Sequence, residues 1–216
     1  MEASLPVIPD RSLPFIELLR ARGLTVIDLD RHFRIERANG DLTKWYCAQD
    51  AHYSRQAIEA LAGLVAEEFE IESTKDSSMS LSAEILSLTG DHVVGSEWEG
   101  RLAGEELNLR AVLNNGDRGI EPDPKSPFLL LGDSHTLVFH QGKEAGMHCR
   151  GGGLLDHLSY QFGEAFDLVG VRVPDSFRRG SSSITGLRQS RDSGIERSLS
   201  SGFSASVNLR NPRTGL

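Results

Sequence analysis

The sequence predicts an α/β fold in which helices cover a mostly parallel sheet. Residues 128–132 and 166–171 are short apolar segments with the length of buried strands. A helical pattern of apolar residues lies between them, over 151–163. Because a strand, a helix and a strand in this order favour parallel pairing, we expect a three-layer sandwich of helices and sheet.

The first third of the chain predicts helices around one further strand. We expect a helix over 12–22, a strand over 24–29 and a short helix over 30–38. A longer helix is predicted over 54–70, where apolar residues recur at helical spacing and Ser54 is well placed to cap the first turn.

The middle of the chain is predicted to form a loop followed by two short strands. Residues 71–80 are polar and read as a loop. Residues 97–104 and 106–113 alternate loosely between apolar and polar, and turn-forming residues follow at 114–117. We expect two short strands here, inserted ahead of the strand at 128–132.

Length, charge and cysteine content limit the function. A chain of 216 residues is long enough for one domain with a good core. Its formal net charge of −8 disfavours nucleic acid as a partner, because phosphate binding needs a basic face. The two cysteines, Cys47 and Cys149, are too few for a disulfide framework, and we expect them to be unpaired.

Three residues in two segments could form a Ser-His-Asp triad. Ser134 follows the predicted strand at 128–132, and open α/β sheets place their active sites at the carboxyl ends of strands. Asp50 and His52 lie two residues apart on the loop entering the helix at 54–70, so the carboxylate can orient the imidazole. A serine hydroxyl needs such a base. We therefore expect Ser134 as nucleophile, His52 as base and Asp50 as the residue that orients it.

Other histidines offer alternatives. His140 is the main rival for the base, whereas His135 is a poor one, because neighbouring side chains diverge from Ser134. His135, His140, His148 and Cys149 are close in sequence but lack the paired spacing of a zinc site. We expect polar loop residues there, with no metal and no cofactor.

At these residues the chain resembles the SGNH-hydrolase-like domain of the alginate O-acetyltransferase family. In that family an Asp-x-His motif precedes the serine, which is the order seen here, and the resemblance covers roughly residues 12–173. Tyr53 departs from it, since the family usually has Trp after the histidine. The stretches that carry the resemblance are Gly23 to Leu29, Asp50-Ala51-His52-Tyr53-Ser54, Leu131-Gly132-Asp133-Ser134-His135, Gly152 to Leu158 and Phe166 to Arg172.

The resemblance implies an SGNH-hydrolase-like fold and an enzyme that acetylates sugar hydroxyls of an exported polysaccharide through an acetyl-serine. Its partners would be the polysaccharide acceptor, an acetyl donor and a membrane acyl-transfer protein. Hydrolysis by the same triad, giving a carbohydrate esterase, and a non-catalytic glycan-binding or inactive fragment are the alternatives. Family members work in the periplasm, but residues 1–6 show no signal peptide, so the printed start predicts a cytoplasmic protein.

Both ends depart from the family. Members carry a further strand and helix ahead of the segment at 13–19, so we expect this start to be truncated and the domain, residues 1–173, to be partial. Residues 174–216 are rich in Ser, Arg and Gly without periodicity, and we expect a disordered tail. Read in another frame, 196–214 is compatible with an apolar closing strand, which suggests a frameshift.

Overall fold

The computed structural model describes residues 12–71, 78–143, 146–172, 185–188 and 206–209. The chain divides into two compact units, Met1–Leu42 and Thr43–Leu216. A mixed α/β structure is confirmed, and the predicted site residues all belong to the second unit.

The first unit contains two helices, α1 (Leu13–Ala21) and α2 (Leu29–Ala38). Both match predicted helices. The Asp28 carboxylate accepts a hydrogen bond from the backbone N–H of Arg31, 3.0 Å away, and so caps α2. The strand predicted over 24–29 is wrong, because these residues instead form an irregular link that ends in this cap.

The second unit begins with the loop that carries Asp50 and His52, followed by α3 (Arg55–Glu68). The prediction of this helix is confirmed, including its cap: the Ser54 hydroxyl accepts from the backbone N–H of Ala57. Ile58, Ala62 and Val65 are buried along one face, as the helical spacing predicted.

An antiparallel hairpin follows, made of β1 (Met79–Leu88) and β2 (Glu105–Asn114), with the short β3 (Asp117–Arg118) beside β2. The prediction of a strand at 106–113 is confirmed by β2. The strand predicted at 97–104 is wrong, because those residues form the turns that connect β1 to β2. The true partner, β1, begins at the end of the segment that was predicted as a loop.

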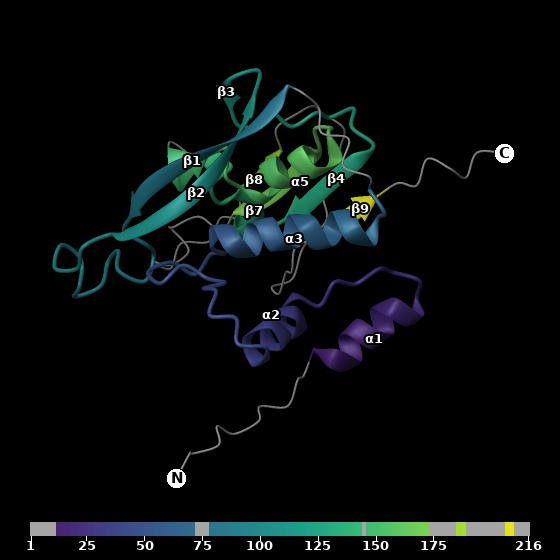
Figure 1. The fold of residues 1–216 in the computed structure, drawn as a ribbon, viewed down its shortest axis with the longest axis horizontal. Coiled ribbons are helices and arrows are strands. Elements are labelled where there is room, and N and C mark those ends of the chain that lie inside the picture. The colour runs from purple at the N-terminus through teal and green to yellow at the C-terminus, as the bar shows by residue number, and fades with distance from the viewer. Residues whose placement is uncertain (1–11, 72–77, 144–145, 173–184, 189–205, 210–216) are drawn as a thin grey trace, which may run out of the picture. The chain divides into compact units, whose positions relative to one another are not determined.

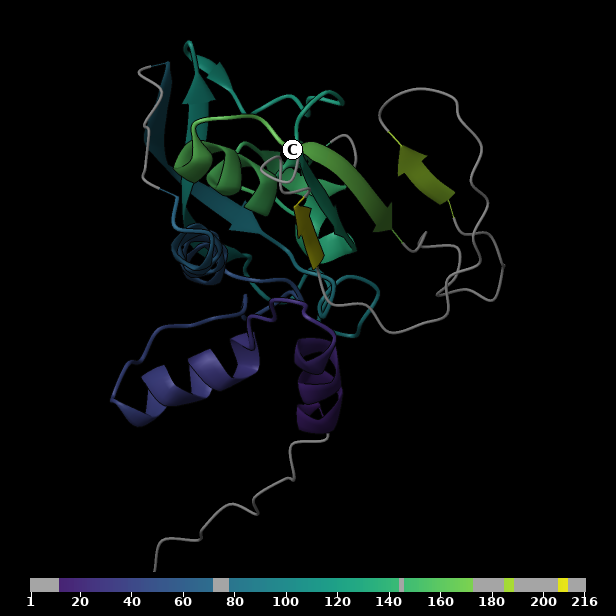
Figure 2. The ribbon, with the colours of Figure 1, turned by 90° about the vertical axis from the view of Figure 1, so that its right-hand side faces the viewer.

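The sheet that carries the predicted serine contains four strands in the order β8-β7-β4-β9. They are β4 (Phe128–Gly132), β7 (Asp167–Arg172), β8 (Thr185–Arg188) and β9 (Ser206–Leu209). Only β4 and β7, side by side in Figure 2, are parallel, while β8 and β9 add antiparallel edges. The predicted mostly parallel sheet is therefore wrong in the described part of the chain. Strands β4 and β7 are joined by a helical crossover of the kind that parallel pairing requires.

That crossover contains α4 (Ser134–Leu137), the two-stranded sheet of β5 (Gln141–Gly142) and β6 (Met147–Arg150), and α5 (Leu154–Phe162). Gly163 ends α5 in the left-handed conformation, with φ of 68°. Helix α4 packs on β4 and β7, where Gly170 of β7 leaves room for the side chain of Leu137.

Helices α3 and α5 pack against each other, and each also contacts β2 (Figure 1). At the end of α5, the rings of Phe128, Phe162 and Phe166 cluster with centroids 5.0–5.2 Å apart. This apolar contact joins β4, α5 and the start of β7. It fixes the strand from which Ser134 emerges.

Most of the predicted tail, residues 174–216, lies outside the described residues. Two of its segments are described, and they form β8 and β9.

Candidate active site

The loop that carries Asp50 and His52 is closed at its base by backbone pairing. Tyr46 and Tyr53 form an isolated antiparallel bridge, and the backbone N–H of Cys47 donates to the carbonyl of His52 at 3.1 Å. The backbone N–H of Ser54 in turn donates to the carbonyl of Trp45 at 3.0 Å. The two chain segments therefore run side by side, and the residues between them form a tight, defined turn.

Both ends of the β1–β2 connection hold the tip of this loop. The Glu105 carboxylate accepts from the backbone N–H groups of Ala48 and Gln49, at 2.7 and 2.9 Å. At the other end, Gly90 lies so close to Gln49 that any side chain at position 90 would collide with the backbone of that residue. Packing and hydrogen bonds thus place Asp50 before any substrate binds.

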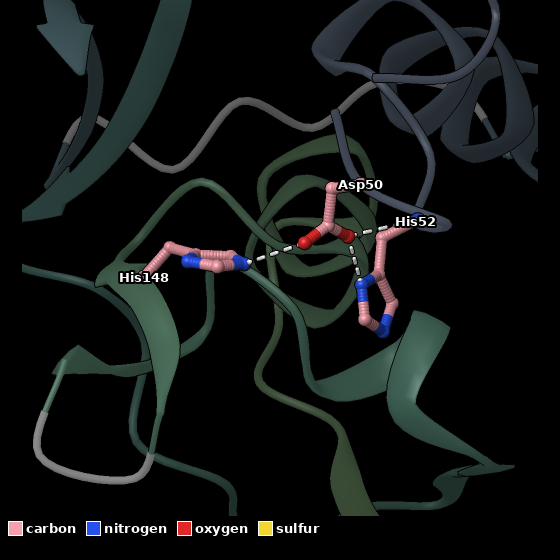
Figure 3. Close-up of side chains that lie close together, drawn as sticks. All are labelled: Asp50, His52 and His148. Atoms are coloured by element: carbon pink, nitrogen blue, oxygen red, sulfur yellow. Dashed lines mark hydrogen bonds and ion pairs between the residues drawn. The ribbon is translucent and has the colours of Figure 1, made fainter. Parts of the chain in front are cut away.

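Asp50 is buried, with 2% of its surface exposed, and both of its carboxylate oxygens accept hydrogen bonds. Oδ1 accepts from the backbone N–H of His52 at 3.0 Å and lies in close contact with Nδ1 of the same residue. Oδ2 accepts from the backbone N–H of Asp91 and from Nε2 of His148, each at 3.2 Å. Figure 3 shows the carboxylate lying between the two imidazoles.

These contacts keep the carboxylate charged. Burial alone would raise the pKa of Asp50, but hydrogen bonds from His148 and His52 outweigh it and hold the pKa well below its usual range. An ionised Asp50 can only accept, so His52 carries its proton on Nδ1. The lone pair of His52 then lies on Nε2, the atom that a triad histidine uses to take a proton from serine.

Ser134 is the first residue of α4, directly after β4, as the sequence predicted. Its neighbour Asp133 caps the short helix by accepting from the backbone N–H of His135 at 2.9 Å. The ring of His135 lies against those of His52 and Tyr53, with centroids 5.1 and 4.4 Å apart. The fold therefore brings the serine segment and the Asp50 loop into contact, although 81 positions separate Tyr53 from Ser134 in the printed sequence.

The structure forms one link of the predicted triad and leaves the other open. Asp50 and His52 are joined, whereas no hydrogen bond between described residues links the Ser134 hydroxyl to His52. In a ligand-free serine enzyme the nucleophile–base hydrogen bond is often long and tightens when substrate binds. Ser134 is half-buried, so its hydroxyl retains access to solvent.

The rival base, His140, lies in a different environment. It is 4% exposed, and its Nδ1 lies 3.0 Å from the Asp156 carboxylate, which has no exposed surface. Asp156 also accepts from the backbone N–H groups of Ile120 and Gly153. His140 is therefore part of a buried network that ties α5 to the chain around it.

The surroundings of His135 do not favour it as the base. Burial lowers the pKa of its imidazole, with the nearby charge of Asp133 opposing that effect. Its Nδ1 is buried, and among the described residues it has no hydrogen-bond partner. Its ring instead fills the space between His52 and Tyr53.

His148 is the site residue that sequence reasoning missed. It was expected to be a polar loop residue, but it reaches Asp50 from β6, 98 positions away. Its backbone is left-handed, with φ of 66°, which costs a non-glycine residue on the order of 1–3 kcal/mol. Neither the spacing nor the local pattern of the sequence signals this contact.

The four residues considered for a zinc site do not form one cluster. His140 pairs with Asp156, and the Cys149 thiol donates to the carbonyl of Phe139. In the described part of the chain, the residues that could offer metal ligands together are instead Asp50, His52 and His148, whose ligand atoms lie within 4.8 Å of one another. The backbone N–H groups of His52 and Asp91 also donate to Asp50, one to each carboxylate oxygen.

Both cysteines are free and buried. Burial raises the pKa of each thiol, Cys47 and Cys149, to about 12. At neutral pH they are therefore protonated and poorly reactive. The serine remains the candidate nucleophile of this site.

A polar pocket lies beside the Asp50 loop, lined by residues that include Lys44, Tyr46, Arg55 and Asn108. None of its lining residues is Asp50, His52 or Ser134.

None of the helices described here is both long and apolar enough to cross a bilayer.

No family model matches the chain, and neither does any curated protein sequence. Among solved structures, the chain is similar to the O-acetyltransferase domain of Pseudomonas putida AlgJ, with a TM-score of 0.48 and 14% sequence identity. The match covers 79% of this chain and 57% of that one, so the chain spans a little over half of the length of that solved domain.

Proposed function

We propose that this protein is a serine acyl enzyme that transfers acetyl groups to sugar hydroxyls of a polysaccharide. The observation that carries the proposal is the pairing of buried Asp50 with half-buried His52, whose imidazole packs against the residue next to Ser134. The order of these residues along the chain, shared with the alginate O-acetyltransferase family, supports acetyl transfer as the reaction.

The mechanism follows from the three side chains. His52 Nε2 takes the proton of the Ser134 hydroxyl as Oγ bonds to the carbonyl carbon of an acetyl donor. The same proton then passes from His52 to the leaving group as the bond between the donor and the acetyl carbon breaks. This leaves an acetyl ester on Ser134 and neutral His52.

The second half returns the enzyme to its starting state. His52 removes the proton of a sugar hydroxyl, whose oxygen attacks the acetyl ester, and the Ser134 oxygen leaves with the proton from His52. The backbone N–H of Ser134 is one donor for the oxyanion that forms in each half. The donor, the membrane acyl-transfer partner and a site outside the cytoplasm belong to this proposal by resemblance to the family.

Active-site labelling tests the proposal. A fluorophosphonate reacts with serines that a base activates, and peptide mass spectrometry identifies the modified residue. We expect labelling at Ser134, loss of labelling in Ser134→Ala and His52→Ala, and retention in His140→Gln molecules that remain folded by circular dichroism. Loss in His140→Gln with labelling retained in His52→Ala would overturn the choice of base.

The alternatives predict different outcomes of the same experiment. Labelled protein that releases acetate from an acetylated glycan, without moving acetyl to a second sugar, would be an esterase that uses water as acceptor. A folded chain that does not label but binds polysaccharide would be a glycan-binding module. Either result would contradict acetyl transfer.

A further inference from the structure

Asp50 is held from two sides, and only one of them belongs to the predicted triad. His52 approaches Oδ1, and His148 approaches Oδ2 from β6 at 3.2 Å. An ionised carboxylate accepts at both oxygens, so Nε2 of His148 carries a proton. His148 is therefore a hydrogen-bond donor to the residue that orients the base.

The backbone around His148 adopts an uncommon conformation. His148 and Phe139 both have positive φ, 66° and 58°, and their rings lie 5.8 Å apart between centroids. The backbone N–H of Phe139 donates to the carbonyl of Met147 at 3.0 Å. Residues persist in this region of backbone space when surrounding contacts determine it, and such residues cluster at functional sites.

Arg150 and Gly151, which follow His148 in the sequence, contact Arg118 and Gly119, which precede β4. The guanidinium of Arg118 donates to the carbonyl of Arg150 at 2.6 Å, and that of Arg150 donates back to the carbonyl of Arg118 at 3.1 Å. Gly151 lies close to Gly119, where a Cβ on it would come within 3.0 Å of the backbone nitrogen. His148 thus reaches Asp50 from a fixed segment.

We propose that His148 is a positioning residue, which acts through the Asp50 carboxylate to hold His52 in the orientation and tautomer needed for proton transfer. This inference rests on the proposed function, because it assigns His148 a part in the same reaction. A carboxylate anchored only from the His52 side could rotate about its Cβ–Cγ bond. His148 and the backbone N–H of Asp91 both donate to Oδ2, and together they oppose that rotation.

The test compares two substitutions at position 148. His148→Phe keeps a ring beside Phe139 but removes the donor, whereas His148→Gln keeps a side-chain N–H. We expect His148→Phe to lower kcat for an activated acetyl ester about 10- to 100-fold with little change in KM, and His148→Gln to recover most of the loss. His157→Gln, at a buried histidine whose ring bonds to the Arg110 carbonyl and does not contact Asp50, is the control.

A spectroscopic readout separates positioning from a general loss of structure. In 15N spectra of the histidine rings, we expect wild type to show His52 in the Nδ1–H tautomer and His148→Phe to show a mixture of tautomers. His148→Phe with kcat and the His52 tautomer both unchanged would overturn the inference. Stoichiometric Zn²⁺ binding that depends on Asp50, His52 and His148 would also overturn it, in favour of a metal centre.

These outcomes are distinct from failure of the proposed function. If His52→Ala and Ser134→Ala both retain the wild-type rate, the acyl-enzyme assignment is wrong. If both lose it while His148→Phe does not, only the role of His148 is wrong.

Discussion

The Asp50–His52 and Asp156–His140 pairs both lie in the second unit of this protein, and they differ in what surrounds the histidine. His52, paired with Asp50, keeps 13% of its side-chain surface exposed and packs against the residue that follows the predicted nucleophile. His140, paired with Asp156, keeps 5% exposed and lies among buried backbone groups. An Asp–His hydrogen bond alone therefore does not indicate catalysis. It becomes a candidate for catalysis where the histidine is also partly exposed to solvent and lies next to a possible nucleophile.

Charge neutralisation at the two aspartates should have opposite consequences. Asp50→Asn removes the acceptor that fixes the His52 tautomer, so we expect kcat/KM for an activated acetyl ester to fall about 10³- to 10⁴-fold with the fold retained. Asp156→Asn should leave activity per folded molecule close to wild type but lower the free energy of unfolding by about 1–3 kcal/mol, because a buried acceptor set is disrupted. Ester kinetics and urea denaturation on both variants provide the measurements. If Asp156→Asn lost activity as strongly as Asp50→Asn while remaining folded, the comparison would break down.

Two glycines sharpen the same contrast. A Cβ at Gly90 would meet the Gln49 backbone and lie 2.7 Å from the backbone nitrogen of Asp50, whereas one at Gly153 would lie 2.6 Å from the Cβ of His140. Gly90→Ala must shift the loop that carries Asp50 and His52, and we expect about a 10- to 100-fold loss of fluorophosphonate labelling rate. Gly153→Ala should lower stability by about 1–3 kcal/mol with the labelling rate of the folded protein kept. Equal labelling rates in the two variants would show that the loop tolerates displacement.

The smallest expected effect concerns the ion pair between Glu59 of α3 and Arg110 of β2. Glu59 of α3 accepts from the guanidinium of Arg110 on β2, and the Arg110 carbonyl in turn bonds to His157 of α5. Burial alone would raise the pKa of Glu59, but the Arg110 hydrogen bond and the electrostatic effects of His157, Arg110 and Arg55 together outweigh it and lower the pKa. Since Arg110 is 43% exposed and solvent screens the pair, we expect Glu59→Gln to cost only about 0.5–1 kcal/mol at pH 7.

The sign of its pH dependence follows from that lowered pKa. A carboxylate with a depressed pKa in the folded state stabilises the protein above its unfolded pKa, about 4.3, and loses this contribution as pH falls through the folded pKa. The difference in unfolding free energy between wild type and Glu59→Gln should therefore shrink below about pH 4. A difference that grew on acidification would show that the pair does not hold the charge as described.

The sequence was sufficient for elements with strong local signals. Helix α3 was predictable because Ser54 caps it and its apolar residues recur at one spacing, and β4 because it is short, apolar and followed by turn residues. Strand β1 was missed because its burial alternates with many exposed positions and its partner lies across a long connection. The antiparallel edges of the four-stranded sheet were missed because pairing depends on distant segments with no local signal.

The candidate site shows the same division. The Asp-x-His spacing and the Gly-Asp-Ser turn are local patterns, so Asp50, His52 and Ser134 could be proposed as a site from residues alone. His148 could not, because its contact with Asp50 depends on a left-handed backbone and on the placement of β6. The structural role of His140 was equally hidden, since only the fold reveals the buried carboxylate beside it.

The connection between β1 and β2 also gives this protein a tryptophan whose fluorescence can be distinguished from that of the other. Of its two tryptophans, Trp45 lies buried at the base of the loop that carries Asp50 and His52, and Trp98 is 51% exposed on the connection whose ends hold that loop. Fluorescence from Trp45 should change when the packing around Asp50 and His52 is lost. Fluorescence from Trp98 should be quenched by a soluble quencher even in the native protein. Each residue can therefore be observed separately by replacing the other with Phe, so substrate-induced changes can be followed without attaching a dye.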